Sequence, residues 1–421
     1  MVMQHRRYSR RQAVLATLAA LGALGAADGF DPRYALARGS ADTGHDAGPR
    51  VSERLVAATR DFGFRLLNGL VTRQPDQNVF ISPSSVATAL AMTYNGAAGA
   101  TRQAMATTLG LQGMGVREVD GDYAALATAL HGRDPHVELT VANSLWSRQG
   151  FAFDPAFVAA LKHYYNAEAT TLDFADPRAA ATINDWVDRE TRGKVARIVP
   201  GRINPGAILY LINAIYFKGR WTIPFDKKQT RKRPFTLPDG QQKSLPMMTR
   251  TGSFSYYQGD GFQGISLPYG NGQWSMVILL PTKGPGLAQL HARLTSANWD
   301  SWLARFSVMH GTILLPRFKV DYSHRLNEAL IALGMGEAFG GQADFSHMTA
   351  APHARISAVD HTALMEVDEE GTTAAAATSV GITTSAVVQG FTMVVDRPFL
   401  RAIRDSATGT VLFAGSIANP E

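Results

Sequence analysis

The feature that most restricts this chain is a stretch near its C-terminal end, residues 371–395, which carries no charged side chain and follows the acidic residues Asp368-Glu369-Glu370. Its first part holds only small and β-branched residues, Gly371-Thr372-Thr373-Ala374-Ala375-Ala376-Ala377-Thr378-Ser379-Val380. Alternate residues of a strand point to opposite faces, and neither face here carries a group that resists burial between two strands. As an exposed loop it would be an aggregation hazard, because it lacks gatekeeping charges. Taken alone, the composition is also compatible with an Ala-rich helix or a flexible linker.

Composition places the chain among globular proteins and removes several kinds of site. The 421 residues are 45% hydrophobic and 18% charged, which excludes a disordered or fibrous chain. At about 150 residues per domain, two or three domains are expected. The absence of cysteine excludes disulfides, thiolate metal sites and cysteine nucleophiles. The 11 histidines show no metal-ligand spacing, so we expect neither a metal nor a cofactor.

The N-terminal residues have the order of an export signal: basic residues, an apolar run from Ala13 to Ala27, then small residues. The run is shorter than the about 20 residues that a membrane span needs. Residues 9–15 resemble a twin-arginine signal. We predict a signal peptide over residues 1–37, cleaved after Ala37 or alternatively after Ala27, and hence an exported, secreted or periplasmic protein without stable membrane insertion after cleavage. An uncleaved N-terminal anchor is the other interpretation.

The charge that remains after cleavage is small. The chain has a net charge of +6, and residues 1–37 contain five arginines and two aspartates, which leaves 36 basic against 33 acidic residues, or +3. This balance argues against a dedicated nucleic-acid partner. Residues 38–51, which are rich in Gly, Ala and Asp, are predicted to be a disordered lead-in.

From Ser52 onward no linker or repeat divides the chain, and helix signals precede strand signals. Apolar residues recur at helical spacing from Leu55, Ser82-Pro83 and Asp154-Pro155 are helix starts, and a fourth helix around Trp186 is predicted to end near Gly193. Strand patterns then dominate, over residues 208–217, 274–280, 312–320, 398–403 and 410–417. This order, without regular β-α alternation, predicts an α+β fold rather than a doubly wound sheet.

The motifs of common enzymes are absent. The chain has no G-x-S-x-G nucleophile elbow, no H-E-x-x-H zinc motif and no complete phosphate-binding loop, since Thr191–Val195 lacks the first glycine and the final hydroxyl. A hydrolase whose residues lie on distant segments stays open as an alternative, because catalytic triads are spatial. We expect a protein that is not an enzyme.

Several motifs together resemble those of the serpins, a family of serine protease inhibitors. Asp368–Thr378 resembles the hinge of the serpin reactive-centre loop. Further matches occur in family order at Asn78–Val86, Asn184–Val187 with Thr191–Lys194, Leu211–Trp221, Leu333–Phe339 with Ala343–Ser346, and Asp396–Leu400 with Asn419-Pro420. The resemblance implies one large domain over residues 52–421, with three β-sheets, eight or nine helices and an exposed reactive-centre loop at about residues 369–395.

The resemblance also implies a mechanism. A target protease cleaves the loop, and before deacylation the loop inserts as a new strand into the central sheet and carries the tethered protease along; serpin loop insertion is itself a standard example of strand addition. The implied partners are serine proteases, held in a covalent complex by a monomer that is kinetically trapped. The uncharged stretch suits insertion, since each ladder hydrogen bond contributes roughly 1 kcal/mol, whereas a buried unpaired charge costs several.

Individual residues take roles through this resemblance. The loop hinge would comprise Glu369, Glu370, Gly371 and the residues Thr372 to Thr378. Two clusters would control the sheet: a shutter beneath the opening strands and a breach where the loop first enters, formed respectively by Ser82, Ser85, Asn213 and His361, and by Trp221, Arg317 and Glu369. The alternatives are an ordinary core histidine for His361 and, for Arg317–Glu369, a surface ion pair worth under about 1 kcal/mol. Thr362 departs from the family, which often has Lys there.

The scissile bond follows from a count. The family places it seventeen residues into the loop, which from Glu369 implies Ser385–Ala386, with Thr384–Ser385 as the alternative. The surrounding residues 383–388 contain no Arg, Lys, Leu or aromatic residue, so they favour an elastase-like or other small-residue-preferring protease. The alternative function is a non-inhibitory serpin that acts as a cleavable carrier or binding module. Bulky or charged residues over 371–378 would favour that alternative, and the stretch has none.

Overall fold

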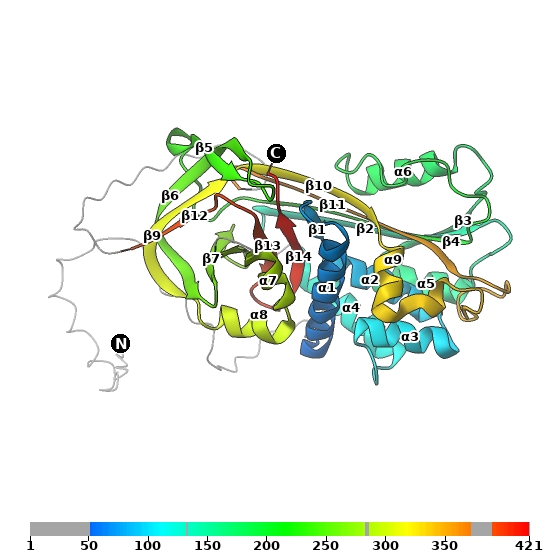
Figure 1. Ribbon diagram of the computed structural model, residues 1–421. Helices are drawn as coiled ribbons and strands as arrows, with labels where there is room; N and C mark the ends of the chain where they lie inside the picture. Colours follow the sequence, from blue (N-terminus) through cyan, green and yellow to red (C-terminus); the bar gives the residue numbers. More distant parts are fainter. Residues whose placement is uncertain (1–50, 132–133, 283–285, 372–389, 421) are drawn as a thin grey trace, which may run out of the picture. The chain divides into compact units, whose positions relative to one another are not determined.

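The computed structural model describes residues 51–131, 134–282, 286–371 and 390–420 (Figure 1). The predicted signal peptide and the lead-in up to residue 50 lie outside the described residues. So do the hinge residues from Thr372 to Thr378 and both positions of the scissile bond, at Thr384, Ser385 and Ala386.

A five-stranded sheet runs through the middle of the fold, in the order β10 (Phe318–Arg325), β11 (Ile356–Val367), β4 (Leu209–Gly219), β2 (Val137–Arg148) and β3 (Glu168–Leu172). β11 pairs with β4 in parallel, and β2 pairs with β3 in parallel, whereas the other two neighbours are antiparallel. β4 is buried along almost its whole length, as its continuous apolar run predicts.

Most helices lie against one face of this sheet, which we call the inner face (Figure 1). They are α1 (Glu53–Arg73), α2 (Pro83–Gly96), α3 (Gly99–Leu109), α4 (Val116–Leu130), α5 (Pro155–Tyr165) and the short α9 (Asn327–Leu330). The predicted starts are confirmed: the Ser82 side chain caps α2, the Asp154 side chain caps α5, and a proline occupies the first turn of each. The inner face and these helices share the main hydrophobic core.

The opposite, outer face is covered by α6 (Ala179–Glu190), which forms a second apolar cluster with outward side chains of β4 and β2 (Figure 1). The helix ends at Glu190, slightly before the predicted end, and Gly193 follows with φ +75° in a turn. The connection from α6 to β4 is held by one side chain. Asn184 Oδ1 accepts from the backbone N–H of Ile198 and of Val199, both at 2.9 Å, and its Nδ2 donates to the Val199 carbonyl at 3.0 Å.

The remaining strands form one nine-stranded sheet, so the described residues contain two sheets where the resemblance implies three. Its order is β1 (Val79–Ile81), β14 (Val411–Ile417), β13 (Phe399–Asp405), β8 (Trp274–Pro281), β7 (Phe262–Tyr269), β6 (Gln242–Gly259), β9 (Ser307–Pro316) and β12 (Phe391–Val394), with β5 (Arg231–Thr236) on β6. The 18-residue strand β6 joins the two halves, because it pairs with β5 and β9 along its length and with β7 at its end. Helices α7 (Gly286–Ala292) and α8 (Ser296–Leu303) complete the nine α-helices of the described ranges, and the α+β prediction is confirmed.

One predicted strand is wrong. The apolar pattern over 312–320 is not a single strand, because the chain leaves β9 after Pro316 and enters β10 at Phe318. The two strands belong to different sheets, and Arg317 stands at the crossing. Local apolar pattern does not mark this change, since β9 ends in the buried run Ile313–Pro316 and β10 begins at once with the buried Phe318.

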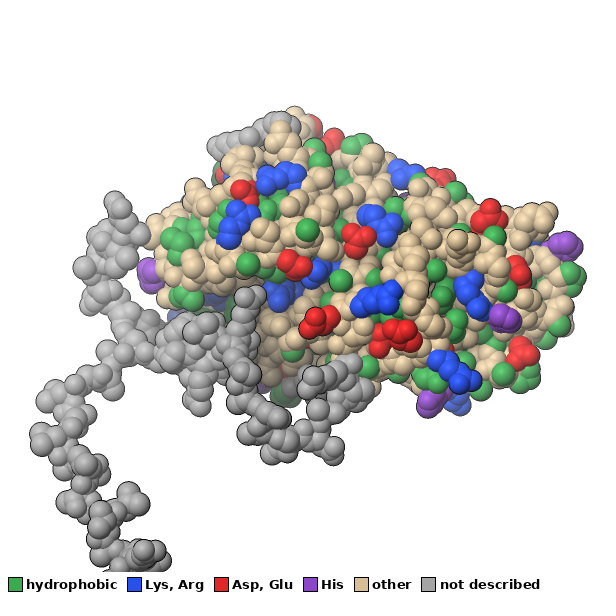
Figure 2. Space-filling view, turned by 90° about the horizontal axis from the view of Figure 1, so that it is seen from below, with side chains coloured by type: hydrophobic (Ala, Val, Ile, Leu, Met, Phe, Trp, Pro, Cys, Tyr) green, Lys and Arg blue, Asp and Glu red, His purple; other side chains and the backbone are tan. Residues whose placement is uncertain are grey.

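Figure 2 shows one face of the molecule, on which charged side chains of both signs occur. There, basic and acidic side chains are interspersed between apolar ones over the described residues. Within the described ranges, no helix combines the length and the apolar character needed to cross a membrane.

The Asn184 clamp generates a stability prediction. Asn184→Ala leaves two backbone donors and one carbonyl of the α6–β4 connection without partners, so we expect the free energy of unfolding to fall by about 2 kcal/mol. Urea unfolding measures the change. Asp185→Ala, at an exposed position of the same helix, is the control and is expected within about 0.5 kcal/mol of the parent. Equal effects of the two variants would contradict a specific clamp.

Candidate functional site

The parallel pairing of β11 with β4, which we call the seam, is the centre of the candidate site. The pairs run from Ile356–Leu209 to Leu364–Tyr216. Beyond the last pair, β11 continues to Val367 and β4 to Gly219, so the two strands end without a direct partner in each other. We call this the open end of the seam. Parallel pairing is slightly less stable per residue than antiparallel pairing, so the seam is a weak join within the sheet.

The chain reverses direction at the open end. After β11, Asp368 Oδ1 accepts from the backbone N–H of Glu370 at 2.9 Å and of Gly371 at 3.2 Å, which closes a tight turn. Gly371 then forms antiparallel bridges with Asp368 on one side and Arg220 on the other. The first residue of the uncharged stretch therefore already lies between the ends of the two strands of the seam.

Only glycine fits at position 371. Its φ is +138°, a conformation that side-chain-bearing residues rarely adopt, and a Cβ there would lie 2.1 Å from the Gly219 carbonyl oxygen. The residue allows the chain to enter the open end without pushing the strands apart.

Backbone and aromatic contacts fix the turn against β4. Trp221 N–H donates to the Glu370 carbonyl at 2.9 Å, and its indole Nε1 donates to the Asp368 carbonyl at 2.9 Å. The Trp221 ring stacks on Tyr269, with centroids 4.3 Å apart. Phe225 N–H donates to the Glu369 carbonyl at 2.8 Å.

The carboxylates of the two hinge residues Glu369 and Glu370 each have a basic partner. Glu369 is 1% exposed, and its Oε1 accepts from Arg317 Nε at 2.9 Å and Nη2 at 2.5 Å and also from the Thr230 hydroxyl. Glu370 pairs with the exposed Lys227. The serpin resemblance implied a cluster of Trp221, Arg317 and Glu369, and in the structure these three residues lie close together at the open end. The structure adds Thr230 and Lys227, which no sequence pattern had marked.

Charge at the open end follows from these contacts. Burial opposes ionisation of Glu369, but hydrogen bonds from Arg317 and Thr230 outweigh it and lower the pKa of this carboxyl. Burial raises the pKa of Asp368, against the two backbone N–H groups that its carboxylate accepts. Glu369 is thus a buried, partnered anion rather than half of a surface ion pair.

A second polar cluster spans the seam on its inner face. His361 of β11 and Asn213 of β4 are register partners, and His361 Nδ1 lies 2.6 Å from Asn213 Oδ1. Ser82 N–H donates to His361 Nε2 at 3.2 Å, so Nδ1 carries the proton and donates to Asn213. Asn213 Nδ2 in turn faces Ser85 Oγ and Asn143 Oδ1, both at 2.5 Å.

All four predicted shutter residues therefore meet at one place, beneath the middle of the seam. Ser82, Ser85, Asn213 and His361 are all buried, and Ser82 also caps α2 by accepting from Ser85 N–H at 3.2 Å. Asn143 on β2 was missed. Its side chain is buried because β2 pairs with β4, which sets Asn143 opposite Asn213, and no local sequence pattern marks this pairing. No group of three or more potential metal ligands gathers anywhere in the described ranges.

Comparisons with known proteins agree with the geometry. The family model described as serpin, serine protease inhibitor, matches residues 57–420. A leukocyte elastase inhibitor from Bos taurus is 34% identical over 379 residues, covering 87% of this chain and 100% of the relative, and a serpin-like protein from Thermococcus kodakarensis is 34% identical over 373 residues. The native thermophilic serpin tengpin has a TM-score of 0.83 at 29% identity, over 89% of this chain and 96% of that structure. Human thyroxine-binding globulin complexed with thyroxine has a TM-score of 0.82 at 26% identity, over 87% of this chain and 99% of that structure.

Two buried histidines predict how stability depends on pH. Burial lowers the pKa of His361 to about 3 and the pKa of His291 to about 4. Both are near 6.5 in an unfolded chain, so the fold favours the neutral rings, and the stability they contribute is complete above about pH 6.5 and is lost as pH falls. We expect each to contribute a slope of about 1.4 kcal/mol per pH unit between about pH 6 and 4.

Urea unfolding of the wild type and of His291→Gln and His361→Gln across this range isolates these slopes, because other titrating groups are common to all three proteins. A variant with the same pH profile as the wild type would contradict the assignment for that histidine. His291 lies away from the seam, where its ring contacts Ser416 and Asn68, and it serves if the His361 variant does not fold.

Proposed function

The chain belongs to the serpin family of serine protease inhibitors, and we propose that it traps its target as a suicide substrate, by inserting the cleaved loop into the seam. The observation that carries this proposal is the pair of bridges at Gly371, which gives the start and the direction of the inserted strand. A strand that continues from Gly371 runs antiparallel to β11 and also antiparallel to β4. Insertion thus replaces one parallel pairing by two antiparallel ones.

Continuing the two bridges gives a single consistent register. Seven residues beyond the Arg220–Gly371 bridge, Thr378 falls opposite Asn213. Seven residues beyond the Asp368–Gly371 bridge, the same Thr378 falls opposite His361. Since His361 and Asn213 are already partners, the seam needs to widen but not to slide. Residues 372–382 would pair with β4 down to Leu209.

The faces of the inserted strand suit this register. Even-numbered residues would share the inner face with Phe217, Ile215 and Asn213 of β4, and on that face lie Thr372, Ala374, Ala376, Thr378, Val380 and Ile382. These small side chains can enter a packed core, whereas a charge there would be buried without a partner. Odd-numbered residues would share the outer face. Thr373, for example, would lie opposite Lys218 and the exposed Glu366.

Insertion depends on the rate at which the seam opens as well as on the free energy gained by the inserted strand. The intact chain has the seam closed, and each new ladder hydrogen bond adds only about 1 kcal/mol, but many form together. The intact protein is therefore a kinetically trapped state that cleavage releases. The protease, joined to the new end of the loop as an acyl-enzyme, would be carried along the sheet before water can hydrolyse the ester.

The residues around Ser385–Ala386 support a protease with a small specificity pocket, with Thr384–Ser385 as the alternative bond. Among the relatives, several are named leukocyte elastase inhibitors, which agrees with this preference. We include in the proposal that the protein is exported, which the N-terminal signal pattern supports, and that it acts as a monomer.

A second candidate function is a carrier whose loop is cleaved without trapping a protease. The likeness to thyroxine-binding globulin in complex with thyroxine favours it, at 26% identity. The sequence of the hinge favours inhibition instead, because residues 371–378 contain no side chain that obstructs entry into the seam.

Complex formation tests the choice. We expect the full chain, mixed with pancreatic elastase, to give a complex that resists SDS and boiling, together with a C-terminal peptide that begins at Ala386 by mass spectrometry. The reason is that the acyl bond survives once the protease is distorted by insertion. Clean cleavage without a complex across a panel of elastase-, trypsin- and chymotrypsin-like proteases would favour the carrier.

A matched pair of hinge variants tests insertion itself. Thr372→Arg puts a guanidinium on the inner face between Val367 and Gly219, so insertion should stall and the moles of inhibitor consumed per mole of protease inhibited should rise at least about tenfold, as a barrier increase of about 1.4 kcal/mol requires. Thr373→Arg adds the same charge on the outer face beside Glu366 and should stay close to the wild type. Equal stoichiometry for the two variants would remove the register.

A further inference from the structure

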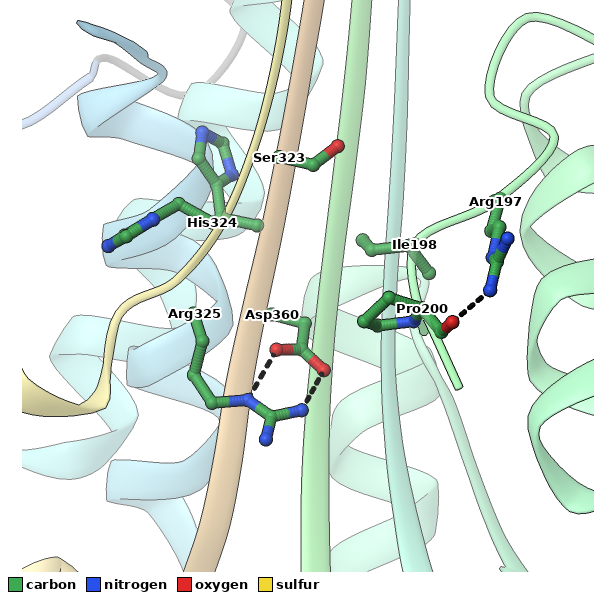
Figure 3. Close-up of a pocket in the computed structure, with 8 residues that line it drawn as sticks. Arg197, Ile198, Pro200, Ser323, His324, Arg325 and Asp360 are labelled. Atoms are coloured by element: carbon green, nitrogen blue, oxygen red, sulfur yellow. Dashed lines mark hydrogen bonds and ion pairs between the residues drawn. The ribbon is translucent and has the colours of Figure 1, made fainter. Parts of the chain in front are cut away.

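The outer face of the seam carries a polar contact of its own, away from the inner cluster. Arg325, the last residue of β10, faces Asp360 of β11 across their antiparallel pairing. Its Nε donates to Asp360 Oδ1 at 2.8 Å and its Nη2 donates to Asp360 Oδ2 at 3.0 Å, the two-pronged geometry visible in Figure 3. The Asp360 side chain is only 6% exposed, whereas that of Arg325 is 47% exposed.

The same guanidinium reaches over the seam. Arg325 Cζ lies 5.6 Å from the ring centroid of Tyr210, which belongs to β4. Tyr210 is 4% exposed and packs edge-on against Phe174, with centroids 5.5 Å apart. The cation thus lies against the face of a ring that the outer apolar cluster holds in place.

These contacts stand at the same level as the inner cluster. Asp360 and His361 are consecutive residues of β11, so their side chains point to opposite faces of the sheet. His361 contacts Asn213 of β4 on the inner face, and Asp360 positions Arg325 against Tyr210 of β4 on the outer face. The middle of the seam is therefore closed on both sides.

We infer that Arg325, Asp360 and Tyr210 form an outer latch, and this inference rests on the proposed function. Asp360 positions the Arg325 guanidinium on the Tyr210 ring. The contact between Arg325 and Tyr210 sets how readily the seam opens for the incoming strand. Adding a strand moves β4 away from β11 by one strand spacing, about 4.8 Å. Arg325 and Asp360 lie on the same side of the seam and move together. Tyr210 lies on the other side, so its contact with Arg325 is lost.

The surroundings of Arg325 leave room for its guanidinium to move off the Tyr210 ring. A cavity of about 590 Å³ lies beside Arg325 and Asp360, and its other wall is the α6–β4 connection at Arg197, Ile198 and Pro200 (Figure 3). Arg197 donates to the Pro200 carbonyl and does not compete for Asp360 in the described contacts. The guanidinium is thus not packed under the connection, and it can leave the ring without dismantling the outer cluster.

The latch differs from an ordinary stabilising contact in one measurable way: it exists only while the seam is closed. A residue that merely supports the fold would stabilise the intact and the cleaved, inserted protein alike. The Arg325–Tyr210 coupling should instead be present in the intact form and absent after insertion.

A double-mutant cycle with Arg325→Met, Tyr210→Leu and the double variant measures this coupling, and the loss of Asp360's partner cancels between its arms. In the intact protein, we expect each single variant to speed the loss of inhibitory activity on heating by about tenfold, and the double variant to add little more. After cleavage in the loop, the same cycle on the unfolding midpoint should show no coupling. Faster insertion should also bring the inhibition stoichiometry of the single variants nearer to one.

A control cycle uses another arginine–aromatic contact. Arg148 Cζ lies 5.0 Å from the Phe151 ring, and this contact does not cross the seam. Arg148→Met and Phe151→Leu should show the same coupling in both forms. If the buried carboxylate keeps Arg325→Met from folding, Arg325→Lys retains the charge but loses the two-pronged bond, and it should fall between the wild type and the expected tenfold change.

The outcomes separate this inference from the proposed function. If the cleaved wild-type protein has no higher unfolding midpoint than the intact protein, insertion is overturned, and the latch with it. A marked gain in stability on cleavage, with coupling that is equal in both forms or missing from the intact form, would leave the inhibitor standing and overturn the latch alone.

Discussion

The parallel pairing between β11 and β4 is the contact on which the other features of this molecule depend. Parallel neighbours bond less favourably than antiparallel ones, so a sheet with this join in its middle can gain by admitting a strand of opposite direction. The turn at Asp368–Gly371 supplies that direction, because it reverses the chain directly after β11. Without the reversal, the uncharged stretch would have no route into the sheet.

Several polar contacts lie along the closed seam. At its open end, Glu369 is buried against Arg317 and Thr230; in its middle, His361 meets Asn213 inside and Arg325 meets Tyr210 outside. Each contact is modest, but all of them cross or border the same join. In the insertion that we propose, they would slow the opening of the seam without adding to the stability of a sheet that has accepted a new strand, and the intact protein would then be stable kinetically.

Much of the scaffold was predictable because it depends on local signals. The caps of α2 and α5, the buried run of β4 and the hairpin of β13 with β14 each follow from neighbouring residues. The predicted strand over 312–320 was wrong because a change of sheet at Arg317 leaves no mark in local periodicity. Asn143, Thr230 and the Arg325–Asp360 pair were missed for a related reason: their partners come from distant segments of the chain, and a polar residue is expected to face solvent until its neighbours are known.

The sequence by itself determined the composition of the segment that we propose to insert, a stretch of small uncharged residues behind an acidic hinge, since size and charge are properties of each residue alone. Only the tertiary structure decided where such a stretch can go. The bridge from Gly371 to Arg220 joins segments far apart along the chain, and in the proposed insertion this long-range pairing would set the strands, the register and the faces of the new strand. Local composition can permit burial, but the choice of neighbours belongs to the folded sheet.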